Sequence, residues 1–146
     1  MRLLIIAIAA WLGLASCDAS DESAPAAARP MVVVSEDDVK VEEAPPHGNI
    51  GMSTAYRISD VAPMRAMEFR KRVLHPGAAI GAHQIGHDEV YYVLSGRGEV
   101  VSDGETAELG PGMAAYFYEG AHVGIRQLGD EPLSIIIAYP VERTKE

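Results

Sequence analysis

The sequence DEVYYVLSGRGEVVSDGE, residues 88–105, decides the fold class. Its apolar part, 90–94, is rich in β-branched and aromatic residues that favour strands, and Gly96 and Gly98 end it. A second strand-like run, 99–102, leads to Asp103-Gly104, a dipeptide typical of hairpin turns because both residues tolerate positive φ. The stretch therefore predicts two strands and the start of a hairpin.

Strand-like runs and turns continue on both sides of this stretch. We predict strands at 66–74, 113–118 and 133–139, separated by turns that contain glycine and proline. Turn signals recur about every 8–12 residues with no helical period between them, which indicates a sandwich or a barrel. The prediction is an all-β domain, with 133–139 as a central strand.

Length and composition restrict the function. One core serves chains of 146 residues, so we expect one folded domain. The net charge of −9 and the pI near 4.9 argue against nucleic acid as a partner, because phosphate binding needs a basic surface. The single cysteine, Cys17, excludes a disulfide within one chain.

The first residues have the layout of a secretory signal. Arg2 precedes an uncharged run, 3–15, that is short for a membrane-spanning helix. Leu14-Ala15-Ser16-Cys17 resembles the lipobox of bacterial lipoproteins, which implies a lipid on Cys17 and an anchor on the periplasmic side of the bacterial cell envelope. Asp18 resembles an inner-membrane retention signal. The alternatives are a soluble secreted protein and an uncleaved anchor.

We expect three segments. Residues 1–16 are the predicted lipoprotein signal peptide, 17–47 an acidic, flexible and disordered tether, and 48–146 the folded domain. The tether is proline-punctuated, and its excess of acidic residues favours an extended chain. Met31 to Val34 offers a short edge strand within it.

A histidine cluster, HQIGHDE at residues 83–89, is the candidate for a metal site. Fully extended, His83 and Glu89 would stand about 20 Å apart, too far for one ion to bridge. A turn at Gly86 would set 83 opposite 89 across two strands, so that His83, His87 and Glu89 converge. Imidazole and carboxylate suit Fe, Mn, Zn or Ni.

The spacing around this cluster resembles the cupin superfamily. The first motif is matched by Gly77, His83, Glu89 and Gly96, and the second by 110–112 and 120–126. The resemblance covers about 65–139 and implies a cupin-type small β-barrel, a double-stranded β-helix or jelly roll. Relatives that pair through sheet edges imply a homodimer.

The sequence departs from the motifs of metal-binding cupins at two positions. In the first motif, Ile85 occupies the position of a usual histidine. In the second motif, Val123 occupies the position of the usual histidine, and His122 lies one residue earlier. The resemblance implies His83 and Glu89 as ligands of one divalent metal, with His87 and His122 as displaced ligands. In the alternative, His87 and His122 lie in solvent, and Ile85 and Val123 form an apolar cavity floor.

Arginines are further candidates for ligand binding. Arg126 follows the second motif, and Arg70 and Arg72 share one face of the predicted strand 66–74. A buried arginine can hold a carboxylate or phosphate in a fork, whereas we expect most of these side chains to be solvated.

Three functions remain open. The leading prediction is an envelope-anchored domain that binds a small polar molecule in the barrel. The first alternative is a metal-dependent enzyme, either a dioxygenase or a sugar- or keto-acid isomerase or lyase. The second is a non-catalytic structural or interaction module whose barrel is filled with side chains.

Overall fold

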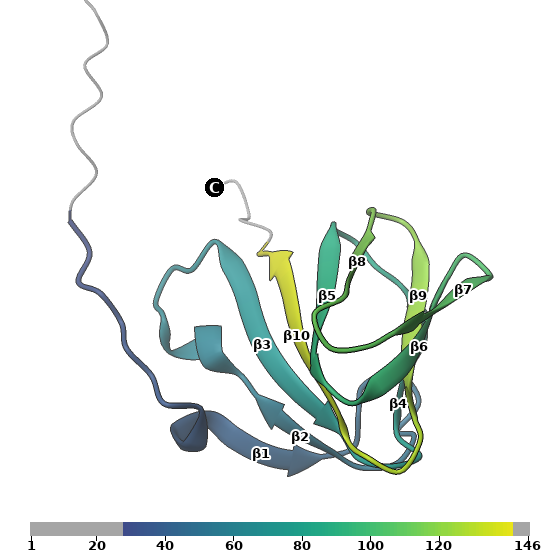
Figure 1. Ribbon diagram of the computed structural model, residues 1–146. Helices are drawn as coiled ribbons and strands as arrows, with labels where there is room; N and C mark the ends of the chain where they lie inside the picture. The colour runs from purple at the N-terminus through teal and green to yellow at the C-terminus, as the bar shows by residue number, and fades with distance from the viewer. Residues whose placement is uncertain (1–27, 142–146) are drawn as a thin grey trace, which may run out of the picture. The chain divides into compact units, whose positions relative to one another are not determined.

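Residues 28–141 are described in the computed structural model, and they consist almost entirely of strands and turns. The strands form two antiparallel sheets (Figure 1). The larger sheet has the order β1-β2-β3-β10-β5-β8, with bounds Lys40–Glu43, Ser53–Tyr56, Met67–Leu74, Leu133–Pro140, Glu89–Ser95 and Ala114–Phe117. The smaller sheet has the order β4-β9-β6-β7, with bounds Ala79–Gln84, His122–Leu128, Arg97–Ser102 and Glu105–Leu109. The predicted all-β class is confirmed.

The hydrophobic core lies between the two sheets. The larger sheet contributes fully buried side chains such as Tyr91, Val93 and Ile135, and the smaller sheet contributes Val123 and Ile125. Side chains of a strand point alternately to the two faces, and this alternation is visible in β5, where Tyr91 and Val93 are buried and Tyr92 and Leu94 exposed. The two faces together exclude water from one continuous core.

Local sequence signals place the strands as predicted. Strand β10 lies between β3 and β5, which explains its apolar run, and Ile136 alone of Leu133–Ile137 is half-buried. The hairpin β6–β7 turns at Asp103-Gly104, whose φ angles are 49° and 88°. Positive φ at both positions is the conformation that this dipeptide favours.

Part of the segment predicted as a flexible tether, 17–47, is folded. A 3-10 helix at Glu36–Val39 and strand β1 at Lys40–Glu43 fall inside it, and β1 pairs with β2. The acidic residues there do not merely repel one another, because Glu43 pairs with Arg57 and Arg72 of the barrel. The predicted edge strand at Met31–Val34 does not form; that segment is irregular and largely exposed.

The compact unit that contains both sheets begins at Met31. The predicted signal peptide, the lipidated Cys17, Asp18 and the first part of the tether, to residue 27, lie outside the described residues. Among residues 28–141, no helix has the length and hydrophobicity needed to span a membrane.

Candidate ligand-binding cavity

A cavity of about 260 Å³ opens inside the barrel. The strands β2, β3, β5 and β10 line it from the larger sheet, β4 lines it from the smaller sheet, and two loops, 46–47 and 85–87, complete it. Its ionisable lining residues are His47, Tyr56, Arg57, Arg70, Lys71, Arg72, His83, His87, Glu89, Tyr91 and Tyr139.

Glu89 is the carboxyl group of the cavity, and its environment favours the protonated form. Its residue is only 6% exposed, at the start of β5. Burial raises the pKa of Glu89, against the opposing effects of the nearby His87, a hydrogen bond from Tyr91 and the charge of Arg70. Burial also raises the pKa of the Tyr91 hydroxyl, so that it stays a neutral donor.

His83 and Glu89 line the same cavity, but the chain between them does not form the predicted turn at Gly86. Strand β4, which carries His83, pairs with β9, whereas β5, which carries Glu89, pairs with β10 and β8. The segment around Gly86 therefore crosses from one sheet to the other and forms no hairpin. The prediction of a cross-strand pair is wrong, because the two residues approach the cavity from different sheets.

Aromatic partners hold the two histidine rings of this cluster. The His83 ring stacks on His47 with centroids 3.5 Å apart, and its Nδ1 lies 2.9 Å from the carbonyl oxygen of Gly81. The His87 ring stacks on Tyr139 at 4.3 Å. The His87 Nδ1 is buried and has no hydrogen-bond partner among the described residues. Buried polar atoms are rarely left unpaired, so this atom needs an explanation.

The residues do not form the metal site that the cupin resemblance implies. Within residues 28–141, no three His, Cys, Asp or Glu side chains lie close enough together to hold a metal ion. His83 is turned to Gly81 and His47, and His87 to Tyr139. The donor set as arranged in the described residues does not fit a three-ligand metal centre.

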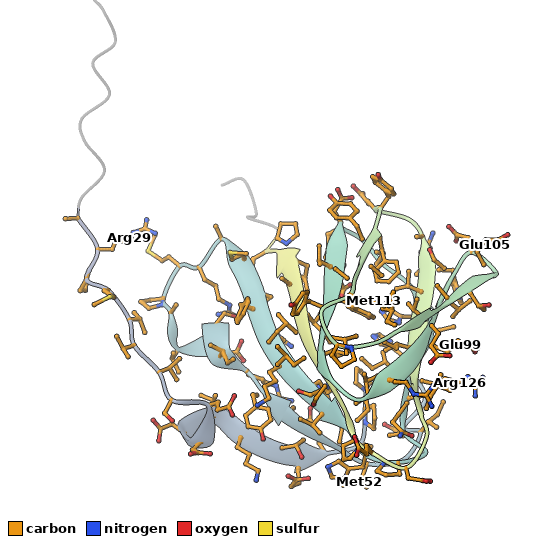
Figure 2. All side chains as sticks on the ribbon, viewed as in Figure 1. Arg29, Met52, Glu99, Glu105, Met113 and Arg126 are labelled. Atoms are coloured by element: carbon orange, nitrogen blue, oxygen red, sulfur yellow. The ribbon has the colours of Figure 1, made fainter. Side chains whose placement is uncertain are left out.

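The remaining sequence-predicted residues fall into two groups. Ile85 is buried and lines the cavity, and Val123 is fully buried in the core opposite His83. His122 and Arg126 do not line the cavity and are exposed. Arg126 donates to Glu99 at 2.8 Å on the outside of β6 and β9, where Figure 2 shows the two side chains together. Alternation along β9 explains this, since Val123 points inward and its neighbour His122 outward.

Two arginines of β3, Arg70 and Arg72, face inward and border the cavity. Arg72 is buried, at 8% exposed, and donates to Ser53 and Glu43; Arg70 is partly buried and donates through Nε to Glu68. We expected solvated side chains. The signal that was present is their shared face with Leu74, which is fully buried.

Glu68, near the start of β3, holds Arg70 in position. Its carboxylate accepts hydrogen bonds from Arg65 at 2.7 Å, Ser59 at 2.6 Å and Arg70 at 3.3 Å. Burial acts to raise the pKa of Glu68, but these hydrogen bonds and the charge of Arg70 outweigh it and lower the pKa to about 2. Glu68 is therefore a fixed negative charge that orients Arg70.

Comparison with protein families matches residues 71–139 to the Cupin domain family. A predicted oxalate decarboxylase from Thermotoga maritima superposes with a TM-score of 0.67 at 21% identity, covering 76% of this chain and 100% of that one. The polyketide cyclase RemF from Streptomyces resistomycificus superposes with a TM-score of 0.66 at 22% identity, covering 80% and 83%. The TT1209 protein from Thermus thermophilus is 34% identical, with a TM-score of 0.51, over 55% of this chain and 77% of that one. Comparison with curated protein sequences finds no match. The first two structures support the predicted jelly-roll barrel.

Proposed function

We propose, from the match of residues 71–139 to the Cupin domain family, that the chain binds a small polar molecule in the cavity of its barrel. The observation that carries the proposal is an open space bordered by buried or half-buried ionisable side chains: Glu89, Arg70 and His87. Burying such groups is costly, and a ligand that pairs with them offsets the cost.

The size of the cavity limits the ligand. A volume of about 260 Å³ lies just below the range of about 300–1,000 Å³ that is usual for ligand pockets, which favours a small organic acid or a small sugar. The same space argues against a barrel interior that is filled with side chains, as a purely structural module would have.

A thermal-shift screen of sugars, hydroxy acids and organic acids tests the binding function. A molecule that binds only the folded state raises the melting temperature. We expect Ala55→Leu, which fills the cavity from the buried wall of β2, to abolish the shift. Ala107→Leu, on the exposed face of β7 outside the cavity, is the matched control and should retain it. Should Ala55→Leu not fold, His83→Ala replaces it. A panel without any shift, or a shift that Ala55→Leu retains, contradicts the proposal.

Metal analysis separates this proposal from the metal-dependent enzyme. We expect protein purified without tag or chelator to hold no stoichiometric Fe, Mn, Zn or Ni. About one equivalent of metal, lost in His83→Ala, would replace direct binding with a metal site.

We propose further that the barrel is tethered to the bacterial envelope through a lipid on Cys17. The support is the lipobox-like Leu14-Ala15-Ser16-Cys17 after an apolar run. Mass spectrometry of the membrane fraction should find a chain that begins at Cys17 and carries acyl mass, and Cys17→Ser should remove that mass. An unmodified chain in the soluble fraction contradicts the anchor.

A further inference from the structure

The side of the larger sheet that points away from the core is almost free of charge across four neighbouring strands, β3, β10, β5 and β8 (Figure 1). We call this surface the outer face. The strand register aligns two rows of side chains across it: Phe69, Ala138, Val90 and Tyr116, then Lys71, Ile136, Tyr92 and Ala114. Neighbours along the strands, such as Ile137 and Tyr91, are buried in the core, so both rows point away from it.

Large apolar and aromatic side chains of the outer face are exposed. Phe69 and Tyr92 are each 41% exposed, and Tyr116 is 55% exposed. Leu94, on the same side of β5 as Tyr92, is 46% exposed. No part of residues 28–141 therefore covers these side chains. A contiguous apolar surface of this kind, with polar residues around it, marks an interaction site.

The outer side of the smaller sheet has the opposite composition. There Arg126 donates to Glu99 at 2.8 Å, and Arg97 donates to Glu108 at 2.7 Å. An antiparallel sheet that meets water on one side carries polar residues on that side. In the larger sheet, only Lys71 is charged among the outward side chains of β3, β10, β5 and β8. Contact with water does not explain this composition.

Polar groups at the border of the outer face are paired within the chain. On one side, Lys71 donates to both carboxylate oxygens of Glu36 at 2.8 Å and lies 4.5 Å from the centre of the Tyr56 ring. On the other side, the Tyr116 hydroxyl donates to Asp88. An apolar centre with aromatic residues, few charges and a polar rim is the composition of a protein–protein interface.

We propose that a second copy of this chain packs on the outer face, sheet against sheet, and forms a homodimer with a two-fold axis. The chain carries a net charge of −9, so two copies repel each other over most of their surfaces. The outer face carries no carboxylate in its four strands, and two copies can approach there without like charges in the centre. A charged partner gains nothing from such a face, whereas the same face of a second copy matches its composition.

The size of the outer face approaches that of a dimer interface. The four strands present roughly 440 Å² of flat sheet, at about 3.4 Å per residue and about 4.8 Å between strands. Protruding side chains make the accessible surface larger than this flat area, and stable interfaces bury about 800 Å² of accessible surface per partner. A two-fold axis brings the same residues of both copies together, as two sheets about 10 Å apart. This pairing is independent of the cavity, and it differs from the pairing through sheet edges that the cupin resemblance implies.

Sedimentation velocity of the full chain over a range of concentrations tests the dimer. We expect a species with twice the mass of one chain, whose share rises with concentration. Tyr92→Lys, in the centre of the outer face, should raise the dissociation constant at least about tenfold, because it places like charges opposite each other across the axis. Circular dichroism checks that this variant folds, and Ala114→Glu replaces it if it does not.

A matched pair of variants locates the contact. Ala114 and Ala107 are both exposed alanines of edge strands, in β8 of the larger sheet and β7 of the smaller one. Ala114→Glu should weaken the dimer at least about tenfold, whereas Ala107→Glu should stay within about twofold of the wild type. Tyr92 lies on β5, one strand in from the edge, so its effect separates pairing through the face from pairing through the edge of β8.

Three outcomes overturn the proposal. One is a wild-type chain that stays monomeric at every concentration. Another is a dimer that Tyr92→Lys and Ala114→Glu leave intact, which would assign the association to a sheet edge or to segments outside residues 28–141. The third is a monomer that sediments with phosphatidylcholine vesicles unless Tyr92 is replaced by lysine, which would make a lipid surface the occupant. Tyr92 does not line the cavity, so none of these outcomes affects the proposed binding function.

Discussion

Replacing Glu68 by glutamine should cost far more stability than replacing an exposed carboxylate. Glu68 is only 5% exposed and accepts hydrogen bonds from Arg65, Ser59 and Arg70. The fall of its pKa from 4.5 to about 2 corresponds to about 3 kcal/mol of folding free energy at neutral pH, at about 1.4 kcal/mol per pH unit. Glu68→Gln removes this contribution and leaves arginines without their anion.

The pH dependence gives the test its sign. A carboxyl group with a lowered pKa in the folded state stabilises the protein fully above the unfolded value of 4.5, and this stabilisation is lost as the pH falls towards 2. By about pH 3, less than half of the contribution remains. The difference between wild type and Glu68→Gln should therefore shrink from pH 7 to pH 3.

Urea denaturation followed by circular dichroism at pH 7 and pH 3 measures both effects. Glu108→Gln is the control, because the Glu108–Arg97 ion pair has the same 2.7 Å separation as Glu68–Arg65, but both of its side chains are more than half exposed. Exposed pairs contribute about 0–1 kcal/mol, so the control should change little. Equal losses in the two variants, or a Glu68→Gln loss that is the same at both pH values, would refute the reasoning.

Other perturbations have equally definite outcomes. Glu89→Gln should raise the melting temperature at neutral pH. Burial raises the pKa of Glu89 in the folded state, so the wild type loses stability as the pH rises through this folded-state pKa. The gain should vanish below the unfolded pKa of 4.5, and a gain that is independent of pH would contradict the burial argument. Gly81→Ala should destabilise the fold by about 1–3 kcal/mol, because the added Cβ would meet the His47 carbonyl oxygen at 1.5 Å. Gly86→Ala is the control and should cost little stability, because a Cβ at Gly86 has no atom within 4 Å. Chemical denaturation compares the two variants, and similar losses of stability would contradict the close approach at Gly81. His122→Ala should leave ligand binding in calorimetry unchanged, because His122 does not line the cavity, and a tenfold loss would place it in the site.

The fold followed from local patterns. The β-branched and aromatic run at 90–94 and the Asp103-Gly104 turn act over a few residues, and the structure contains the strand and the hairpin that they predict. Short-range signals of this kind survive folding because a strand buries one face whatever its neighbours are. The extent of the folded domain was harder to predict: β1 looks like acidic tether until Arg57 and Arg72, more than ten residues away, pair with Glu43.

The sequence by itself determined that this chain is all-β, since strand periodicity and the spacing of glycines depend on neighbours along the chain. It suggested His83, His87 and Glu89 as one cluster, but through a turn at Gly86 that does not form. Only the tertiary structure decided how the cavity is built: which sheet carries each of these residues, that Arg126 pairs outside with Glu99, and that Arg70 borders the cavity while it pairs with Glu68 and Asp60. These features depend on strand pairing between distant segments and on which arginine meets which carboxylate. Charge and spacing along the chain do not specify those partners, because they are selected by packing in three dimensions.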